Sequence, residues 1–233
     1  MGNTNHKHIA IAGPTSVGKG YTGKQIIEAL GEKKVWMIVL GKLIVDRMNR
    51  DVGFREQCCE TVKRGELLPY EVVTPMVEES YQEGITAGFD VFCWDGYARD
   101  ERQAERLLQI WDVPKIGHTN YRFFMLRASK ATCRGRLDEA ITSGRRSSRG
   151  DNDAFDDRYK LHNENEPGVI KTIEGSGGFV KVINANKPLE IVAKSVLISL
   201  RQIVPFKYSA HFENEPQSIT TMARSSRPSL VAA

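Results

Sequence analysis

The sequence lacks several features that mark particular protein classes. Its 233 residues include only four cysteines, and no two of them have the C-x-x-C spacing of a zinc site. No stretch approaches the roughly 18 apolar residues of a membrane helix, and the N-terminus has no apolar signal core. We therefore expect a reduced cytoplasmic protein that neither spans a membrane nor is secreted.

The sequence also has only a small excess of charge of one sign. The formal net charge is +4, which does not by itself predict nucleic acid or an acidic membrane as a partner. With 40% apolar and 27% charged residues, the composition is that of a globular protein. The length favours one domain, or one domain with an insertion.

Five short apolar runs alternate with longer amphipathic stretches. These runs are HIAIAG, VWMIVL, DVFCWD, YRFFML and FVKVIN. Apolar strands separated by helices are typical of a buried parallel sheet. We predict an α/β fold with a five-stranded parallel sheet and helices on both faces. His6 and His8, just before or at the first strand, are expected to face solvent.

Two segments are too long or too polar for simple crossovers. Residues 41–87 have helical spacing throughout, with breaks expected at Gly53, Gly65 and Pro69. Residues 143–157 are polar, contain glycine and are rich in arginine, which predicts a mobile loop. Residues 201–233 form a C-terminal extension that we expect to be disordered from about Glu213.

The motif G-x-x-x-x-G-K occurs at Gly13–Lys19, after the first predicted strand and before a helix. Backbone N–H groups in such a loop form a cup for anions, and the lysine reaches the β- and γ-phosphates of a nucleotide. The alternative is an ordinary glycine-rich turn with a solvent-facing lysine. Gly20 stands where the general motif has Ser or Thr.

Asp95 ends the third predicted strand. A carboxylate at this edge, beside a phosphate loop, can hold Mg²⁺ directly or through water. The alternative role is to cap a helix or form a turn, and the neighbouring phosphate loop favours Mg²⁺.

Several motifs in the same order resemble the adenylate kinase family. GPTSVGKGY corresponds to the family's GPPGSGKGT, GELLPYEVV to a glycine followed by LVPDEVV, and VINANKPLEIV to a strand followed by IDGTKP and a helix. DGYAR with Gln103 corresponds to DGFPR with a glutamine four residues after the arginine. The resemblance runs from about Lys7 to Leu200.

The resemblance implies a division of the chain and a role for each matched residue. The P-loop core would comprise 1–40, 88–142 and 158–200, with a monophosphate-binding insertion at 41–87 and a lid at 143–157. Arg99 would hold the acceptor phosphate and Gln103 would read adenine. The implied ATP-binding residues are Gly13, Thr15, Ser16, Val17, Gly18, Lys19, Gly20, Tyr21, Arg136 and Lys187. The implied monophosphate-binding residues are Gly41, Arg47, Leu67, Leu68, Gly96, Arg99 and Gln103.

Arginines in and after the polar loop suit phosphoryl transfer, because catalysis there requires charge neutralisation and alignment. Planar guanidinium groups can clamp phosphate oxygens. The candidates are Arg145, Arg146, Arg149 and Arg158, of which Arg149 and Arg158 join Lys19, Arg99 and Asp95 in the predicted catalytic set. The alternative is a solvated basic loop or an RNA-binding patch.

Several positions depart from the family pattern, and three of them concern the binding of phosphate. Ser16 replaces a glycine, and we expect it to be tolerated only if its φ is negative. Val45 and Ala140 stand where the family has arginines. Arg47 is a nearby substitute for Val45, but it lies about 200° around a helix from that position.

The resemblance implies a monomer that transfers the γ-phosphoryl group of Mg-ATP to AMP, without a nucleic-acid or membrane partner. Two alternatives stay open. One is a different acceptor, GMP, CMP or UMP, and the other is a nucleotide-binding protein with weak or no turnover.

Overall fold

The computed structural model describes residues 6–32, 34–117, 119–145 and 154–205. Its single five-stranded sheet has the order β2-β3-β1-β4-β5, and every neighbouring pair is parallel. The predicted α/β fold is therefore confirmed. The strands are β1 (Lys7–Ala12), β2 (Val35–Val39), β3 (Val91–Asp95), β4 (Tyr121–Arg127) and β5 (Val180–Asn184).

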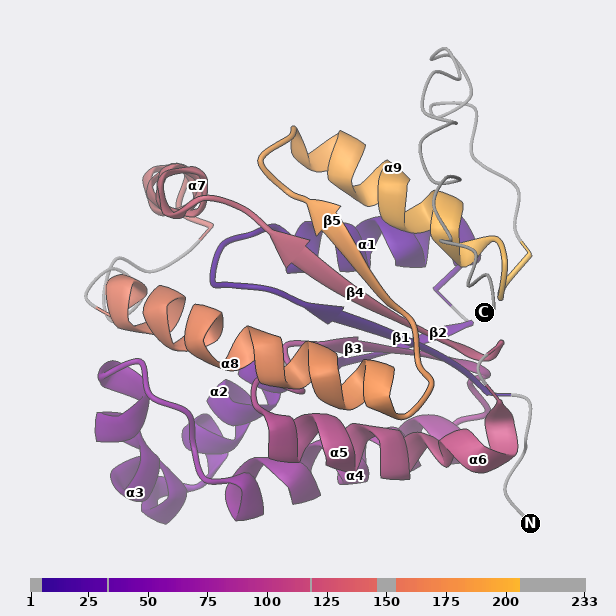
Figure 1. Cartoon of the computed structure of the whole chain (residues 1–233). Helices are drawn as coiled ribbons and strands as arrows, with labels where there is room; N and C mark the ends of the chain where they lie inside the picture. Colours follow the sequence, from indigo (N-terminus) through magenta and orange to yellow (C-terminus); the bar gives the residue numbers. More distant parts are fainter. Residues whose placement is uncertain (1–5, 33, 118, 146–153, 206–233) are drawn as a thin grey trace, which may run out of the picture.

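Helices cover both faces of the sheet (Figure 1). On one face lie α1 (Lys19–Leu30) and α9 (Leu189–Leu200), and on the other lie α4 (Tyr70–Thr86), α5 (Glu101–Trp111) and α8 (Phe155–Gly175). Successive strand residues point to opposite faces. Ile9 and Ile11 accordingly pack in the core beneath α1 and α9, whereas Ala10 and Ala12 belong to the core beneath α4 and α5.

Three helices occupy most of the chain between β2 and β3: α2 (Leu40–Arg50), α3 (Val52–Lys63) and α4. The first break falls at Asp51, whose side chain accepts a hydrogen bond from the Phe54 N–H at 2.9 Å and so caps α3. Gly53 lies inside α3, so the break predicted there is wrong. Gly65 and Pro69 lie between α3 and α4, with Pro69 immediately before the first residue of α4.

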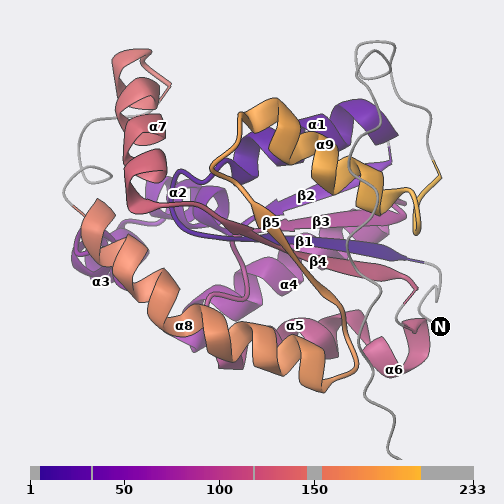
Figure 2. The ribbon, with the colours of Figure 1, turned by 45° about the horizontal axis from the view of Figure 1, so that its top comes forward.

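The remaining described helices are α6 (Val113–Ile116) and α7 (Lys130–Thr142). Figure 2 shows α7, the start of α8, α2 and α3 gathered at one end of the sheet. Of the predicted lid, residues 155–157 belong to the first turn of α8. Arg146 and Arg149 lie outside the described residues, as does the tail from residue 206.

Both N-terminal histidines are buried, which contradicts the expectation that they face solvent. His6 is 7% exposed and His8 is 0% exposed. His8 is the second residue of the central strand β1, where helices cover both faces. Its ring stacks on those of Phe92 and Trp111, with centroids 5.7 and 5.3 Å away.

None of the helices in the described parts of the chain combines the length and the apolar character needed to cross a membrane.

Candidate functional site

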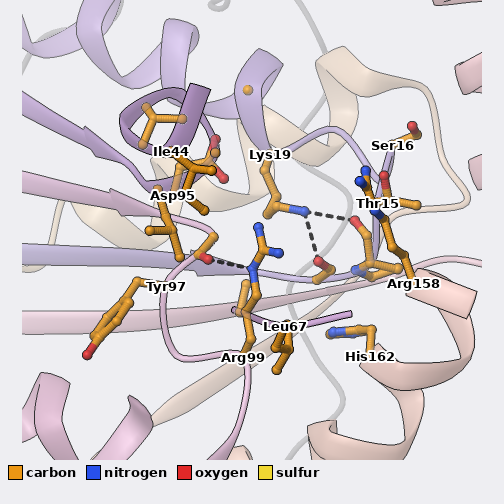
Figure 3. Close-up of a pocket in the computed structure, with 18 of the residues that line it drawn as sticks. Thr15, Ser16, Lys19, Ile44, Leu67, Asp95, Tyr97, Arg99, Arg158 and His162 are labelled. Carbon is orange, nitrogen blue, oxygen red and sulfur yellow. Dashed lines mark hydrogen bonds between the residues drawn. The ribbon is translucent and has the colours of Figure 1, made fainter. Parts of the chain in front are cut away.

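A cavity of about 680 Å³ lies at the carboxyl ends of the strands. Its walls come from the loop after β1, the start of α2, the turn between α3 and α4, the loop after β3, and parts of α7 and α8. Ligands in open α/β sheets bind at this edge because the connecting loops and helix N-termini meet there. Figure 3 shows side chains from several of these elements directed into the same space.

The loop after β1 requires glycine at two positions. Gly13 has a φ of 145°, and a Cβ there would lie 2.6 Å from the Leu126 carbonyl oxygen. Gly18 has a φ of 112°, and a Cβ there would lie 2.6 Å from a Leu189 methyl carbon. The two glycines let the loop pass close to β4 and α9 before it enters α1 at Lys19.

Ser16 contradicts the expectation of a negative φ. Its φ is 58°, in the left-handed region. Short polar residues reach this region at a cost of about 1–2 kcal/mol, and the loop holds Ser16 there. The backbone therefore keeps a glycine-like conformation even though the glycine of the family motif is absent.

Lys19 folds back across the phosphate loop. Its ammonium group donates hydrogen bonds to the carbonyl oxygens of Gly13 and Pro14, both at 2.8 Å (Figure 3). The lysine is the first residue of α1, so its charge lies beside a helix N-terminus. This arrangement places a cation beside the phosphate loop and the N-terminus of α1, where an anion is electrostatically favoured.

Asp95 ends β3 and pairs in register with Ile11 on β1 and Val39 on β2. It is 7% exposed and lines the cavity beside the phosphate loop. Mg²⁺ at phosphate sites is usually held by one or two carboxylates together with substrate oxygens and water. A single carboxylate at this place fits that role, whereas Gly20 supplies no hydroxyl ligand.

The turn after β3 holds Arg99 tightly. Gly96 and Ala98 have φ values of 77° and 60°, and the Arg99 Nε donates to the Gly96 carbonyl at 2.7 Å. Burial lowers the pKa of the Arg99 guanidinium, the charge of Asp95 opposes this shift, and Arg158 adds to it. Two arginines so close in a buried cavity form a site that favours an anion between or beside them.

Gln103 uses its side chain to hold the same turn. Its Oε1 accepts from the Arg99 N–H at 3.1 Å, and its Nε2 donates to the Asp100 carboxylate at 3.2 Å. The residue lines the cavity but is only 1% exposed. To read a base as the resemblance implies, the amide must exchange these contacts for contacts with the base.

Arg158, in the first turn of α8, connects two walls of the cavity. Its Nη2 donates to the Val62 carbonyl on α3 at 3.0 Å. The turn after α3 approaches closely, since a Cβ at Gly65 would lie 2.9 Å from Ala154 Cβ. Arg158 therefore projects from α8 over the helices that follow β2.

Arg136 on α7 connects the phosphate loop to the loop after β5. Its Nη1 donates to the Val17 carbonyl and its Nη2 to the Lys187 carbonyl, both at 2.7 Å. Lys187 thus meets Arg136 through its backbone, while neither Val17 nor Lys187 contributes to the cavity wall.

The substituted positions lie on the cavity itself. Val45 is 53% exposed and lines the wall, and so does Ala140. Arg47 does not line it, because its guanidinium lies 5.0 Å from the centre of the Phe54 ring on α3. In this arrangement, therefore, Arg47 does not take the place of the arginine that the family has at the position of Val45.

Most residues singled out from the sequence meet at this one cavity. Those that line it are Gly13, Thr15, Ser16, Gly18, Lys19, Gly20, Tyr21, Gly41, Leu67, Leu68, Asp95, Gly96, Arg99, Gln103, Arg136 and Arg158. The sequence analysis missed His162 and Asn165, which line the wall on α8 together with Arg158. The available signal was helical spacing, since His162 follows Arg158 by four residues and Asn165 follows His162 by three.

Sequence comparison identifies relatives that are similar to part of this chain. No protein-family model matches it. A probable chloroplastic adenylate kinase 6 of Oryza sativa subsp. japonica is 31% identical over 53% of this chain and 41% of its own length. An adenylate kinase of Solanum tuberosum is 30% identical over 45% of this chain and 35% of its own.

A bacterial relative extends the same result. An adenylate kinase of Thermus thermophilus is 26% identical over 42% of this chain and 48% of its own length. The matches thus span less than half the length of these relatives. Together with the five-stranded parallel sheet and the glycine-rich loop after β1, they relate the chain to the adenylate kinase family.

Proposed function

We propose that the protein is a nucleoside monophosphate kinase that transfers the γ-phosphoryl group of ATP to AMP. The observation that carries the proposal is that the phosphate loop with Lys19 and the turn with Arg99 open into one cavity. Two anionic substrates must meet in such a reaction, and a shared cavity lined by cations from both sides provides for that.

In the proposed reaction, a phosphate oxygen of AMP attacks the γ-phosphorus, and the bond from that phosphorus to the β–γ bridging oxygen breaks. The products are two molecules of ADP. Lys19 would leave the carbonyls of Gly13 and Pro14 for the phosphates of ATP, since a phosphate oxygen is a more negative acceptor than a carbonyl. Arg99 would hold the AMP phosphate, and Arg158 would neutralise charge as it develops between them.

Mg²⁺ bound with ATP would be held by Asp95 through water, and the phosphates of ATP would complete its coordination shell. When bound, the ion would offset negative charge on the β- and γ-phosphates. In the described part of the chain no group of three or more metal-ligating side chains occurs, which fits an ion that arrives with its nucleotide.

The shape of the cavity supports ATP as donor and a nucleotide as acceptor. Arg136 spans the phosphate loop and the loop after β5, where the resemblance puts the ATP base. On the other side, Leu67, Leu68 and Val73 give an apolar wall on which a base can lie. Such a wall does not distinguish one base from another, so the preference for AMP depends on Gln103.

The test is a coupled assay that offers ATP with AMP, GMP, CMP or UMP and measures ADP. We expect turnover with AMP, and loss of ATP binding in Lys19→Ala. Lys24→Ala on the same helix is a matched control, because it removes a lysine that does not line the cavity. Retention of ATP binding in Lys19→Ala would contradict the role of the phosphate loop. Faster turnover with CMP or UMP would contradict only the acceptor.

A second candidate is a nucleotide-binding protein with weak or no turnover. It is favoured by Val45 and Ala140, which face the cavity without a positive charge. This protein would bind ATP through the same loop but would form no ADP with any of the four acceptors. Binding and turnover measured on one preparation therefore separate the two functions.

A further inference from the structure

His162 is fixed in the cavity wall by a buried carboxylate. Its Nε2 lies 3.1 Å from Glu166 Oε2, one turn further along α8. The two side chains are only 14% and 8% exposed. Figure 3 shows the His162 ring directed into the space that also receives Lys19 and Arg99.

Glu166 has a second partner and stays ionised. It accepts a hydrogen bond from Nε of Arg127, at the end of β4. Burial by itself raises the pKa of the Glu166 carboxyl, but the hydrogen bonds from His162 and Arg127 outweigh it and hold this pKa below its ordinary value. An ionised carboxylate only accepts hydrogen bonds, so the proton of this pair lies on His162 Nε2.

The second ring nitrogen of His162 is then the one that can meet a ligand. Among the residues that the structure describes, Nδ1 has no hydrogen-bond partner. His162 also lies one turn after Arg158 on the same face of α8, and both line the cavity. With a proton on each nitrogen, the ring would donate to Glu166 and to an anion at the same time.

We propose that His162 binds a phosphate group of the nucleotide through Nδ1, with Glu166 as its positioning residue. The inference rests on the proposed function for the identity of the ligand. Phosphate is favoured over other ligand groups by the charges around the ring. The charged groups that line this cavity with His162 are Lys19, Glu66, Asp95, Arg99, Arg136, Arg145 and Arg158.

All five of those cations already have partners in this structure, and Lys19, Arg99 and Arg158 donate to backbone carbonyl oxygens. Arg136 donates to two backbone carbonyls, and Arg145 pairs with Glu139 at 2.9 Å. Val45 and Ala140 supply no charge. A further donor on α8 would therefore add to Lys19, Arg99 and Arg158 where two sets of phosphates must be neutralised.

Two substitutions separate a phosphate contact from a purely structural role. His162→Gln puts an amide near the place of Nε2, so it can keep the contact with Glu166 but loses Nδ1. His162→Asn puts an amide near the place of Nδ1 and loses the contact with Glu166. Binding of ATP and of AMP is measured for each by calorimetry, together with the melting temperature.

We expect His162→Gln to bind ATP or AMP about 10-fold or more weakly, the usual effect of losing a hydrogen bond to a charged group. His162→Asn should bind close to wild type but melt at a lower temperature. If His162 serves only to satisfy Glu166, the glutamine variant will bind both nucleotides like wild type, and the proposal is wrong. Asn163→Ala is the control, because the neighbouring side chain faces the groove on the other side of α8.

The nature of the contact and the proposed function are tested separately. If the loss in His162→Gln disappears with 2′-deoxy or 3′-deoxy nucleotides, the partner is a ribose hydroxyl and the phosphate assignment is wrong. If the wild type binds ATP and AMP but forms no ADP, the kinase proposal fails while the contrast between the two variants still decides the role of His162. If the wild type binds neither nucleotide, both proposals fail.

Discussion

Acid should destabilise this protein through His8, which lies at the opposite end of the sheet from the cavity. Burial, together with a smaller contribution from the neighbouring His6, lowers the pKa of His8 to about 3. The ring is surrounded by Tyr81, Phe92, Trp94 and Trp111. No carboxylate among the described residues raises the pKa of His8, so a charge in this aromatic cluster would lose its hydration without compensation.

The direction of the pH effect follows from comparing the protonation of His8 in the unfolded chain and in the folded protein. In the unfolded chain, His8 takes up a proton below its ordinary pKa of about 6.5, whereas in the folded protein it stays neutral until about pH 3. Stability is therefore complete above pH 6.5 and declines as the pH falls toward 3. Each pH unit in this window costs about 1.4 kcal/mol, so the loss between pH 7.5 and 5 is about 2 kcal/mol.

Urea unfolding at pH 7.5, 6 and 5, followed by tryptophan fluorescence, measures this loss. His8→Phe removes the titrating group but also removes the acceptor of the Trp94 indole N–H, at 3.4 Å. Its stability at pH 7.5 therefore changes, and the informative quantity is the slope against pH. That slope should be smaller than in wild type by about one proton.

Tyr81→Phe is the matched control, because burial raises the pKa of Tyr81 to about 12 and it does not titrate in this range. It should keep the slope of the wild type. An unchanged slope in His8→Phe would refute the reasoning, since it would mean that His8 is protonated in the folded protein as readily as in the unfolded chain. A contribution from His6, whose pKa burial also lowers, would leave part of the slope in both variants.

Three further outcomes follow from single positions. Ser16→Val should lower the free energy of unfolding by about 1–2 kcal/mol relative to Ser16→Gly in urea unfolding, because a branched residue resists a φ of 58°; equal stabilities would contradict the strained loop. Val45→Arg should tighten AMP binding about 10-fold in calorimetry, because it adds a phosphate donor to the wall; unchanged binding would place the AMP phosphate elsewhere. Gly84→Ala should lower the melting temperature, because its Cβ would lie 2.7 Å from Phe92 and Trp36 ring atoms; a rise would show that the rings move aside.

The sheet and the phosphate loop could be predicted from the sequence because both depend on local patterns. Each apolar run is short and bounded by turn residues, and the glycines of the loop stand at fixed spacing after the first run. The parallel arrangement brings the ends of β1 and β3 together, so Lys19 and Asp95 meet although they are 76 positions apart in the chain.

Long-range contacts account for what the sequence did not reveal. His8 looked exposed because it stands near the N-terminus, and only the packing of α4 and α5 under β1 buries it. No sequence motif marks His162 as a site residue. It lines the cavity only because of the way α8 packs, and Glu166 then lies one turn further along the helix. Gly53 looked like a break because glycine weakens helices, but the cap at Asp51 fixes the start of α3.

The departures from the family motifs differ in what they cost. Where the backbone forms the site, a changed side chain can leave the conformation in place, as Ser16 does with its left-handed φ. Ala98 differs, because its φ of 60° is one that the proline of the family motif could not adopt. Where the side chain supplies the charge, as at Val45 and Ala140, no backbone conformation can replace it. The proposed phosphoryl transfer would therefore depend on the polar side chains that remain at the cavity, and Lys19, Arg99, Arg158 and His162 are the positions at which single substitutions should reduce it most.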